Sequence, residues 1–529
     1  MPYRPIQWAS RSIEGRQVEA DGSRLLDFYA TQITPPAVGQ TPKVPVMLYS
    51  SPGLRRWLRV PSRTTPQSVT PEKGVHGLLE IVNPSYGRRL VGLTGQYFFF
   101  DVRFGDGNGM IPWPYDPFAG GVTRIAQSDI LQYTPEAAEA APGGEPRKLA
   151  TDGRRVIWGS RNEIFVYDLG KSGGAGLISV AAPAVPDLST LEDLGFQDWV
   201  DVAWVDNFFL LASRSGTFFH SQFDSVQFDQ LDFAEAGTNP DEIVGMEILN
   251  RRIFLIGRET VEQWFNAGGA DFAFARDNSF TVQIGCGAKA SIAKNLYSIF
   301  FLGTDGIVYS LASGGVRRIS TQSVEYDVAR SSLSQARGYT YTEEGHHFYS
   351  LILTFPGGAR KNWTFDYSMG LWHERGETGI ICVERFGQRN LAGRQGMDHI
   401  FDQRLDWGSV DDDTSGNSEV YREAISPVLF QNMQRANMNS FQVDIPHRDG
   451  GAAQDTVLIE WSDDNKVTWK GGLNLEGGSS RALRLDTGTR FRVNRMGQLR
   501  TGRNIRLSTR ARRRVDILGA YVETDLLPD

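Results

Sequence analysis

The 529-residue sequence predicts an all-β protein: a β-propeller core of six or seven blades, an extended N-terminal arm and a C-terminal β-sandwich. Aromatic residues make up 11% of the chain and there are 57 glycines, a mixture typical of short strands joined by tight turns. An aromatic-rich strand also returns at a mean spacing of roughly 50 residues, as in a propeller. Helical patterns are weak, since the Ala/Glu-rich run 134–141 is short and ends at a Pro-Gly-Gly sequence.

Residues 1–75 are expected to form a Pro-rich extended arm, because ten prolines interrupt them. Proline has no N–H to donate to a β-ladder, so such a segment cannot make a sheet of its own. We expect the arm to lie on the main body or on a neighbouring subunit.

Residues 76–410 carry the repeat and are predicted to form the propeller-like domain. A buried-looking strand is followed by a Gly-, Asn- or Asp-containing turn and then by an aromatic-rich strand. This pattern is typical of a β-hairpin. The alternative is a β protein of several sheets with accidental spacing. The aromatic-rich strands begin near Tyr97, Ile164, Thr217, Val261, Ile307, Trp363 and Ile400.

Residues 411–529 are predicted to form a separate β-sandwich after a linker at 409–418. Its strands are expected at 440–445, 456–461, 481–485, 490–493, 505–507 and 515–522, separated by polar turns.

The net charge of −7 is unevenly distributed, because residues 476–529 contain twelve arginines and six acidic residues. The overall charge argues against a protein that wraps nucleic acid with its whole surface. The basic end is interpreted as a surface that docks an acidic protein partner, and a solvated strand face or a contact with nucleic acid is the alternative. Protein docking is favoured over nucleic acid, because no base-stacking aromatics lie between these arginines. The candidate docking residues are Arg490, Arg492, Arg510, Arg512, Arg513 and Arg514.

No motif indicates an enzyme, a cofactor or a metal site. The two cysteines, Cys286 and Cys382, are expected to be free, reduced and buried. His346-His347 and His373-Glu374 lack the spacing of a metal or acid–base site, and segments 106–109 and 411–413 are interpreted as solvated turns rather than calcium loops. With no signal peptide and no apolar run of about 20 residues, the protein is expected to be made in the cytoplasm and to have no membrane span.

A single motif resembles the Asp-box of sialidases and related proteins: Ser462, Asp464, Thr468 and Trp469, with Lys466 where the family has glycine. The resemblance implies a hairpin whose turn is tied by the aspartate, remote from catalysis. One copy does not indicate a sialidase, which would need several copies and an arginine triad. A sugar-binding role for Trp461 and Trp469 stays open, because these side chains could stack on sugars or fill the sandwich core.

An ordered series of segments resembles the tail accessory proteins of short-tailed phages, also called tail-hub or packaged-DNA stabilisation proteins. It runs from Leu48 to Arg375 and includes LYSSPGL at 48–54, WVDVAWVDNFF at 199–209, LIGRETVEQWFNAG at 255–268, RIST at 318–321 and GLWHER at 370–375.

The resemblance implies a structural virion protein of the tail, without a cofactor. Such proteins form a ring, typically a hexamer, below the portal and its adaptor protein. The ring continues the DNA channel, retains packaged double-stranded DNA and carries the needle, spikes or fibres. A net acidic wall would let DNA slide. The alternatives are a host-glycan hydrolase and a carbohydrate-binding tail protein on a propeller.

Overall fold

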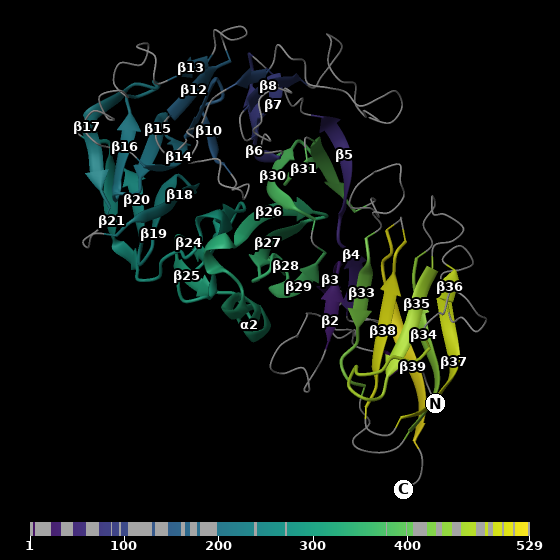
Figure 1. The fold of residues 1–529 in the computed structure, drawn as a ribbon. Helices are drawn as coiled ribbons and strands as arrows, with labels where there is room; N and C mark the ends of the chain where they lie inside the picture. Colours follow the sequence, from purple (N-terminus) through teal and green to yellow (C-terminus); the bar gives the residue numbers. More distant parts are fainter. Residues whose placement is uncertain are drawn as a thin grey trace, which may run out of the picture.

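The computed structural model is almost entirely β, with one described α-helix, α2 (Gln322–Arg330), and two short 3₁₀ turns, η3 (Lys289–Ser291) and η4 (Leu333–Gln335) (Figure 1). The described residues are 4–5, 23–32, 46–59, 74–85, 87–94, 97–103, 130–132, 147–159, 164–169, 177–179, 198–236, 241–269, 272–376, 378–397, 399–405, 420–429, 436–446, 456–471, 482–484, 490–499, 502–511 and 514–526. The run 134–141 lies outside them.

The middle of the chain forms successive antiparallel units of four strands. The first four units are β6 (Val75–Asn83), β7 (Gly87–Thr94), β8 (Tyr97–Arg103) and β9 (Ile130–Gln132); β10 (Leu149–Thr151), β11 (Arg155–Gly159), β12 (Ile164–Asp168) and β13 (Leu177–Ser179); β14 (Trp199–Val205), β15 (Phe208–Ser213), β16 (Thr217–Ser221) and β17 (Phe228–Glu235); and β18 (Ile243–Leu249), β19 (Arg252–Gly257), β20 (Val261–Asn266) and β21 (Phe274–Val282). The next are β22 (Ala293–Lys294), β23 (Ile299–Leu302), β24 (Val308–Ala312) and β25 (Gly315–Arg318); and β26 (Arg337–Glu343), β27 (His346–Thr354), β28 (Arg360–Asp366) and β29 (Leu371–Arg375). The last unit is β30 (Ile380–Phe386), β31 (Arg389–Arg394), β32 (His399–Arg404) and, from the N-terminal segment, β5 (Gly53–Arg59).

The aromatic-rich repeat seen in the sequence is the third strand of every unit. The starts expected near residues 97, 164, 217, 261, 363 and 400 fall at or inside β8, β12, β16, β20, β28 and β32, and the start expected near 307 lies one residue before β24. Hairpin turns of two residues with positive φ recur between the first and second strands, at Asp206-Asn207, Asn250-Arg251 and Glu344-Gly345. This turn matches the right-handed twist of the strands on either side.

Apolar clusters join each unit to the next around the ring. For example, Phe98 of β8 and Trp158 of β11 share one cluster, and Ala203 of β14 and Met246 of β18 share another. A further cluster joins the last unit to the first through Phe386 of β30 and Val75 of β6. The prediction of an all-β, propeller-type protein is confirmed. Separate sheets form these units, with no strand ladder between neighbours among the described residues, and the count of six or seven blades stays a prediction.

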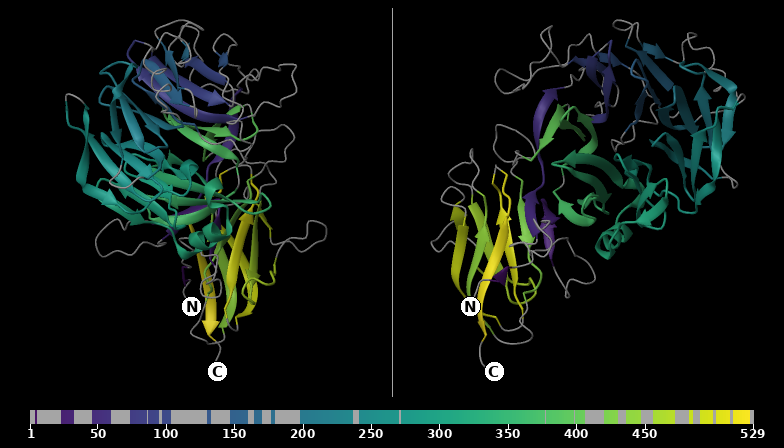
Figure 2. Two further views of the ribbon diagram at one scale, coloured as in Figure 1. Left: turned by 60° about the vertical axis from the view of Figure 1, so that its left-hand side comes forward. Right: turned by 180° about the vertical axis from the view of Figure 1, so that it is seen from behind.

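The C-terminal strands form two facing sheets with one apolar core between them. One sheet has the order β1 (Arg4–Pro5), β39 (Gly519–Leu526), β34 (Ala436–Asp444) and β37 (Arg490–Leu499). The other has the order β33 (Arg422–Ile425), β38 (Asn504–Thr509), β35 (Thr456–Ser462) and β36 (Ala482–Arg484). In both views of Figure 2 these strands, in yellow, reach the lower end of the molecule.

The N-terminal segment connects the two bodies. β2 (Arg24–Leu26) lies between β29 and β33, so a single nine-stranded sheet continues from β26 to β36. β3 (Phe28–Gln32) and β4 (Val46–Ser50) pair with each other as a hairpin, although the prolines had predicted no sheet of its own for this segment. Described prolines lie outside the β3–β4 ladder, which is therefore not interrupted.

Candidate functional site at the joint of the two bodies

The region where the propeller meets the sandwich is built largely by the N-terminal segment, and we call β2, β3 and β4 with their contacts the joint. In Figure 1 these strands, in purple, lie between the green strands β26–β29 and the yellow-green C-terminal strands. The joint contains a hairpin with one face in each body, a row of charges across the sheet and a further ion pair at Arg514.

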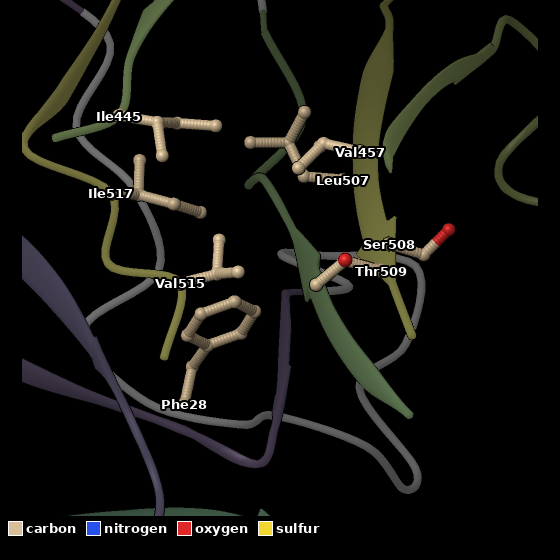
Figure 3. A pocket seen from close by; sticks show the side chains of 8 residues that line it. All are labelled: Phe28, Ile445, Val457, Leu507, Ser508, Thr509, Val515 and Ile517. Atoms are coloured by element: carbon tan, nitrogen blue, oxygen red, sulfur yellow. The ribbon is translucent and has the colours of Figure 1, made fainter. Parts of the chain in front are cut away.

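The hairpin β3–β4 has one face in each body. Phe28 and Leu48 belong to the core cluster of the sandwich, whereas Tyr29 belongs to a cluster of the propeller. Successive side chains of a strand point to opposite faces, so two adjacent residues reach two different cores. Phe28 lines one end of an apolar pocket in the sandwich core (Figure 3); the other lining residues are Ile445, Val457, Leu507, Ser508, Thr509, Val515 and Ile517.

On the other face, the Tyr29 ring packs among aromatic rings of the propeller. Its centroid lies 5.1 Å from the ring of Phe348 and 5.2 Å from that of His346, both in edge-to-face geometry. Such pairs stabilise beyond their burial alone by about 0.5–1.5 kcal/mol. Buried contacts of this size on both faces make the hairpin a fixed spacer between the bodies.

Charged side chains of alternating sign follow one another across six successive strands of the nine-stranded sheet, and we call this row the charge ladder. Neighbouring members pair at 3.5, 2.9, 3.2 and 3.9 Å, and the last pair has a hydrogen bond of 2.7 Å. In strand order they are Lys361 of β28, Glu374 of β29, Arg24 of β2, Glu423 of β33, Arg506 of β38 and Glu460 of β35.

Arg24 is the member of the ladder that links the two bodies. Its Nε and Nη2 donate to Glu374 of the propeller at 3.2 and 2.9 Å, and its Nη1 donates to Glu423 of the sandwich at 3.2 Å. Glu374 and Glu423 are 1% and 4% exposed. Buried carboxylates need such partners, because an uncompensated buried charge costs several kcal/mol.

A second ion pair crosses the joint at Arg514, whose side chain is buried. Its guanidinium donates to Asp516 within the sandwich and to Glu344 in the β26–β27 turn of the propeller, at 3.0 and 2.6 Å. Backbone bonds between Leu48 and Ile517, of 3.0 and 2.8 Å, fix the hairpin at the same place.

The structure places the predicted docking arginines in varied surroundings. Arg514 is in the joint and not on an open surface. Arg490 and Arg492 lie on the edge strand β37, mostly exposed, and pair with Asp444 and Glu523 at 3.1 and 2.8 Å. Arg510 is exposed, with its guanidinium 5.6 Å from the centroid of the Tyr421 ring. Arg512 and Arg513 lie outside the described residues.

Asp444 of β34 and Glu523 of β39 therefore offset the charges of two arginines on β37. The sequence could not show this, because Asp444 and Glu523 lie 46 and 31 residues away from the arginines that they meet.

The Asp-box-like segment forms a tight turn after β35. Asp464 accepts hydrogen bonds from the N–H and hydroxyl of Thr468, and the hydroxyl of Ser462 donates to it at 2.7 Å. The bonds from Thr468 lower the pKa of Asp464 to about 2. Lys466 adopts a φ of 70°, the left-handed region that glycine favours, at the position where the family has glycine.

The two tryptophans of this hairpin face different surroundings. Trp461 is 8% exposed in the sandwich core, so it is not a platform for sugars. Trp469 is half-buried, and the guanidinium of Arg506 lies 4.2 Å from its ring centroid. One face of Trp469 is thus covered by a member of the charge ladder.

The histidines and cysteines have structural environments. His346 Nδ1 lies 2.6 Å from Asp366, and burial lowers the pKa of His373 to about 3. Cys286 is buried and Cys382 is partly buried; both are free. Among the described residues, no three His, Cys, Asp or Glu side chains gather as metal ligands, and no helix is long and apolar enough to cross a membrane. Segments 106–109 and 411–413 lie outside this part of the chain.

The charge ladder was not predicted from the sequence, because Arg24 lies 350 and 399 residues from its two acidic partners. The sequence did contain one signal for the joint. The two ends of the ordered series, LYSSPGL and GLWHER, meet at the joint, where Arg375 donates a hydrogen bond of 2.7 Å to the carbonyl of Pro52.

Comparison with protein families gives one match: residues 136–372 fit the phage-stabilisation family described as "Bacteriophage P22 Gp10, beta-propeller". The resemblance to phage tail accessory and DNA-stabilisation proteins is confirmed over this part of the chain. No curated protein matches.

Three solved structures that are similar over 66% of this chain have TM-scores of 0.36 or less. A computationally designed protein, Ika8, is 9% identical with a TM-score of 0.36 and is covered over 98% of its own chain. BBS1N, solved in complex with ARL6DN, is 10% identical with a TM-score of 0.32 and is covered over 96%. Raptor of Chaetomium thermophilum is 9% identical with a TM-score of 0.36 and is covered over 29%.

Proposed function

We propose that this chain, whose residues 136–372 are those of the phage-stabilisation propeller family, is the tail-hub protein of a short-tailed phage. In this proposal several copies, six by analogy with the family, form a ring below the portal adaptor. The ring continues the DNA channel, retains the packaged DNA and carries a needle, spikes or fibres at its far side. The family match is the observation that carries the proposal.

The joint supports a mechanical role of this kind. A ring wall under load must keep its shape, and here two β bodies are connected by a continuous sheet, a buried hairpin and cross-strand ion pairs. Packed interiors transmit strain instead of absorbing it. A sandwich held in this way would keep a fixed direction relative to the propeller, which a protein that positions neighbours requires.

Contacts within the ring would be heterologous, since a head-to-tail interface closes into a ring when its rotation is right. Of the predicted docking arginines, Arg490, Arg492 and Arg510 remain candidates for contacts with neighbours, because their side chains are exposed. Arg514 is not a candidate, because its guanidinium is used within the chain.

The proposal is tested with phage particles that lack the protein. We expect such particles to package DNA and then lose it, and purified protein to assemble with the adaptor into a ring of defined mass. Particles that keep their DNA and fail only at adsorption would contradict the sealing role. A mass equal to one copy per adaptor complex would contradict the ring.

We further propose that the chain is not an enzyme. The single Asp-box-like turn binds its own backbone, and its Trp461 is buried in the core. Purified protein incubated with host polysaccharide should release no product, and any released oligosaccharide would restore the hydrolase alternative.

A further inference from the structure

One face of the strands β26–β29 carries many polar side chains beside the apolar Phe348 and Ile352, although it is buried. The opposite face carries Leu351, Trp363 and Trp372 in an apolar cluster, as expected for alternating side chains. The residues facing the joint include Tyr339 and Tyr341 of β26, Ser350 of β27, Asn362 and Thr364 of β28, and His373 and Arg375 of β29, each no more than 5% exposed.

Part of this polar face is satisfied by direct hydrogen bonds. Ser350 and Thr364 share one of 2.8 Å, and Asn362 Nδ2 donates to the hydroxyl of Tyr339 at 3.2 Å. Arg375 reaches the same hydroxyl at 3.4 Å. The direct bonds are therefore concentrated at Tyr339.

Other buried polar atoms of the same layer have no hydrogen-bond partner among the described residues. They come from three parts of the fold: the β3–β4 hairpin, the strands β26–β29 and the last unit. They are the hydroxyls of Tyr29 and Tyr341, Asn362 Oδ1, His373 Nε2, Arg375 Nε, and both Nε2 and Oε1 of Gln403.

These groups lie close together. The rings of Tyr29 and His373 are 6.2 Å apart, and the guanidinium of Arg375 lies 5.1 Å from the centroid of the Tyr341 ring. Gln403 of β32 lies two residues from Phe401 and two from Leu405, which share an apolar cluster with Tyr29 and Tyr341. Its side chain therefore points to the same side of the strand as theirs.

We propose that internal water molecules occupy this layer and bridge Tyr29, Tyr341, Arg375 and Gln403. Native proteins leave very few buried polar groups unbonded, and buried water typically serves such groups with about three hydrogen bonds. The unpartnered atoms include donors and acceptors, a mixture that water satisfies. A small anion would leave the carbonyl oxygens of Gln403 and Asn362 unmatched.

The substitution Tyr341→Phe distinguishes a hydrated layer from a dry one. If its hydroxyl bonds to water, the variant loses a hydrogen bond and its denaturation temperature falls. If the hydroxyl is unpartnered, its removal relieves a buried polar group and the temperature rises or stays the same, which would overturn the proposal. Tyr339→Phe is the matched control, since its hydroxyl has direct partners and its loss must lower the temperature in either case.

A second measurement does not depend on the stability of a variant. A map of the unmodified protein, at a resolution that shows ordered solvent, should contain density within hydrogen-bond distance of Tyr341 and Gln403. Continuous side-chain packing there without such density would refute the proposal.

Discussion

At the scale of single residues, Arg24 is the most consequential side chain in the joint. It is the charged group between two buried carboxylates that belong to different bodies, Glu374 and Glu423. The Arg24 side chain is 28% exposed, so removing it costs little burial of its own. The loss of stability comes mainly from the two buried carboxylates, which would lose their shared partner.

We expect Arg24→Met to destabilise the protein by about 2 kcal/mol, less than for a fully buried pair because Arg24 reaches solvent. Urea unfolding followed by fluorescence measures the change. Arg251→Met is the control, because the Arg251 side chain is 80% exposed in its pair with Asp206. Such a surface pair contributes about 0–1 kcal/mol. Equal losses in the two variants would show that the ladder does not hold the joint.

A second residue-scale prediction concerns Phe28, which is 1% exposed in the sandwich core. Phe28→Ala should cost about 3–5 kcal/mol, because the cavity adds to the lost burial. The cavity left by the substitution would extend the apolar pocket lined by Ile445 and Val515. We expect hydrogen exchange to rise first in the C-terminal strands; a rise confined to the propeller would contradict the placement of Phe28.

At the scale of elements, the sequence predicted what local chemistry decides. The aromatic-rich strands were located because each follows an apolar strand and a turn that lie within a few residues of it in the sequence. The third-strand position in each unit was not predicted, since it depends on which neighbours pair. The joint was missed for the same reason: the pairing of β2 with β29 and β33 joins residues hundreds of positions apart.

β5 shows the same limit and leads to a prediction. Nothing in its sequence distinguishes an arm on a surface from the fourth strand of the last unit, where it pairs with β32. Deleting residues 1–59 should expose the edge of β32. It would also remove Trp57 and Leu58, whose side chains cover the apolar cluster of that unit. Exposed strand edges promote aggregation.

We therefore expect low soluble yield and aggregates in size-exclusion chromatography after this deletion. Deleting only residues 1–22, which retains β2 to β5, is the control and should give soluble protein. A soluble 1–59 deletion with an unchanged denaturation temperature would mean that β5 does not stabilise the last unit.

At the scale of the whole molecule, two carboxyl groups with raised pKa values lie where the last unit contacts its two neighbours. Glu384 of β30 accepts a bond of 3.2 Å from the Glu80 N–H of the first unit, and burial together with the Glu80 charge raises its pKa to about 7. Glu343 of β26 accepts from Asn390 of the last unit at 3.0 Å, and its pKa is raised to about 7 by burial and by Glu344.

These carboxyls make stability depend on pH in a defined window. Their ordinary pKa is 4.5, so between pH 4.5 and 7 the folded state keeps protons that the unfolded state releases. Stability then falls as pH rises, by about 1.4 kcal/mol per pH unit for each group, and the loss stops above about pH 7. Denaturation measured at several pH values should show this slope.

The double variant Glu343→Gln/Glu384→Gln tests whether these two groups cause the slope, because an amide has no proton to release in this range. We expect the decline between pH 4.5 and 7 to flatten, with the largest gain in stability at neutral pH. Glu242→Gln, at an exposed ion pair with Arg258, is the control and should keep the slope. An unchanged slope in the double variant would assign the pH dependence to other groups. A flattened slope would mean that the contacts of the last unit with its two neighbours weaken as these carboxyls ionise.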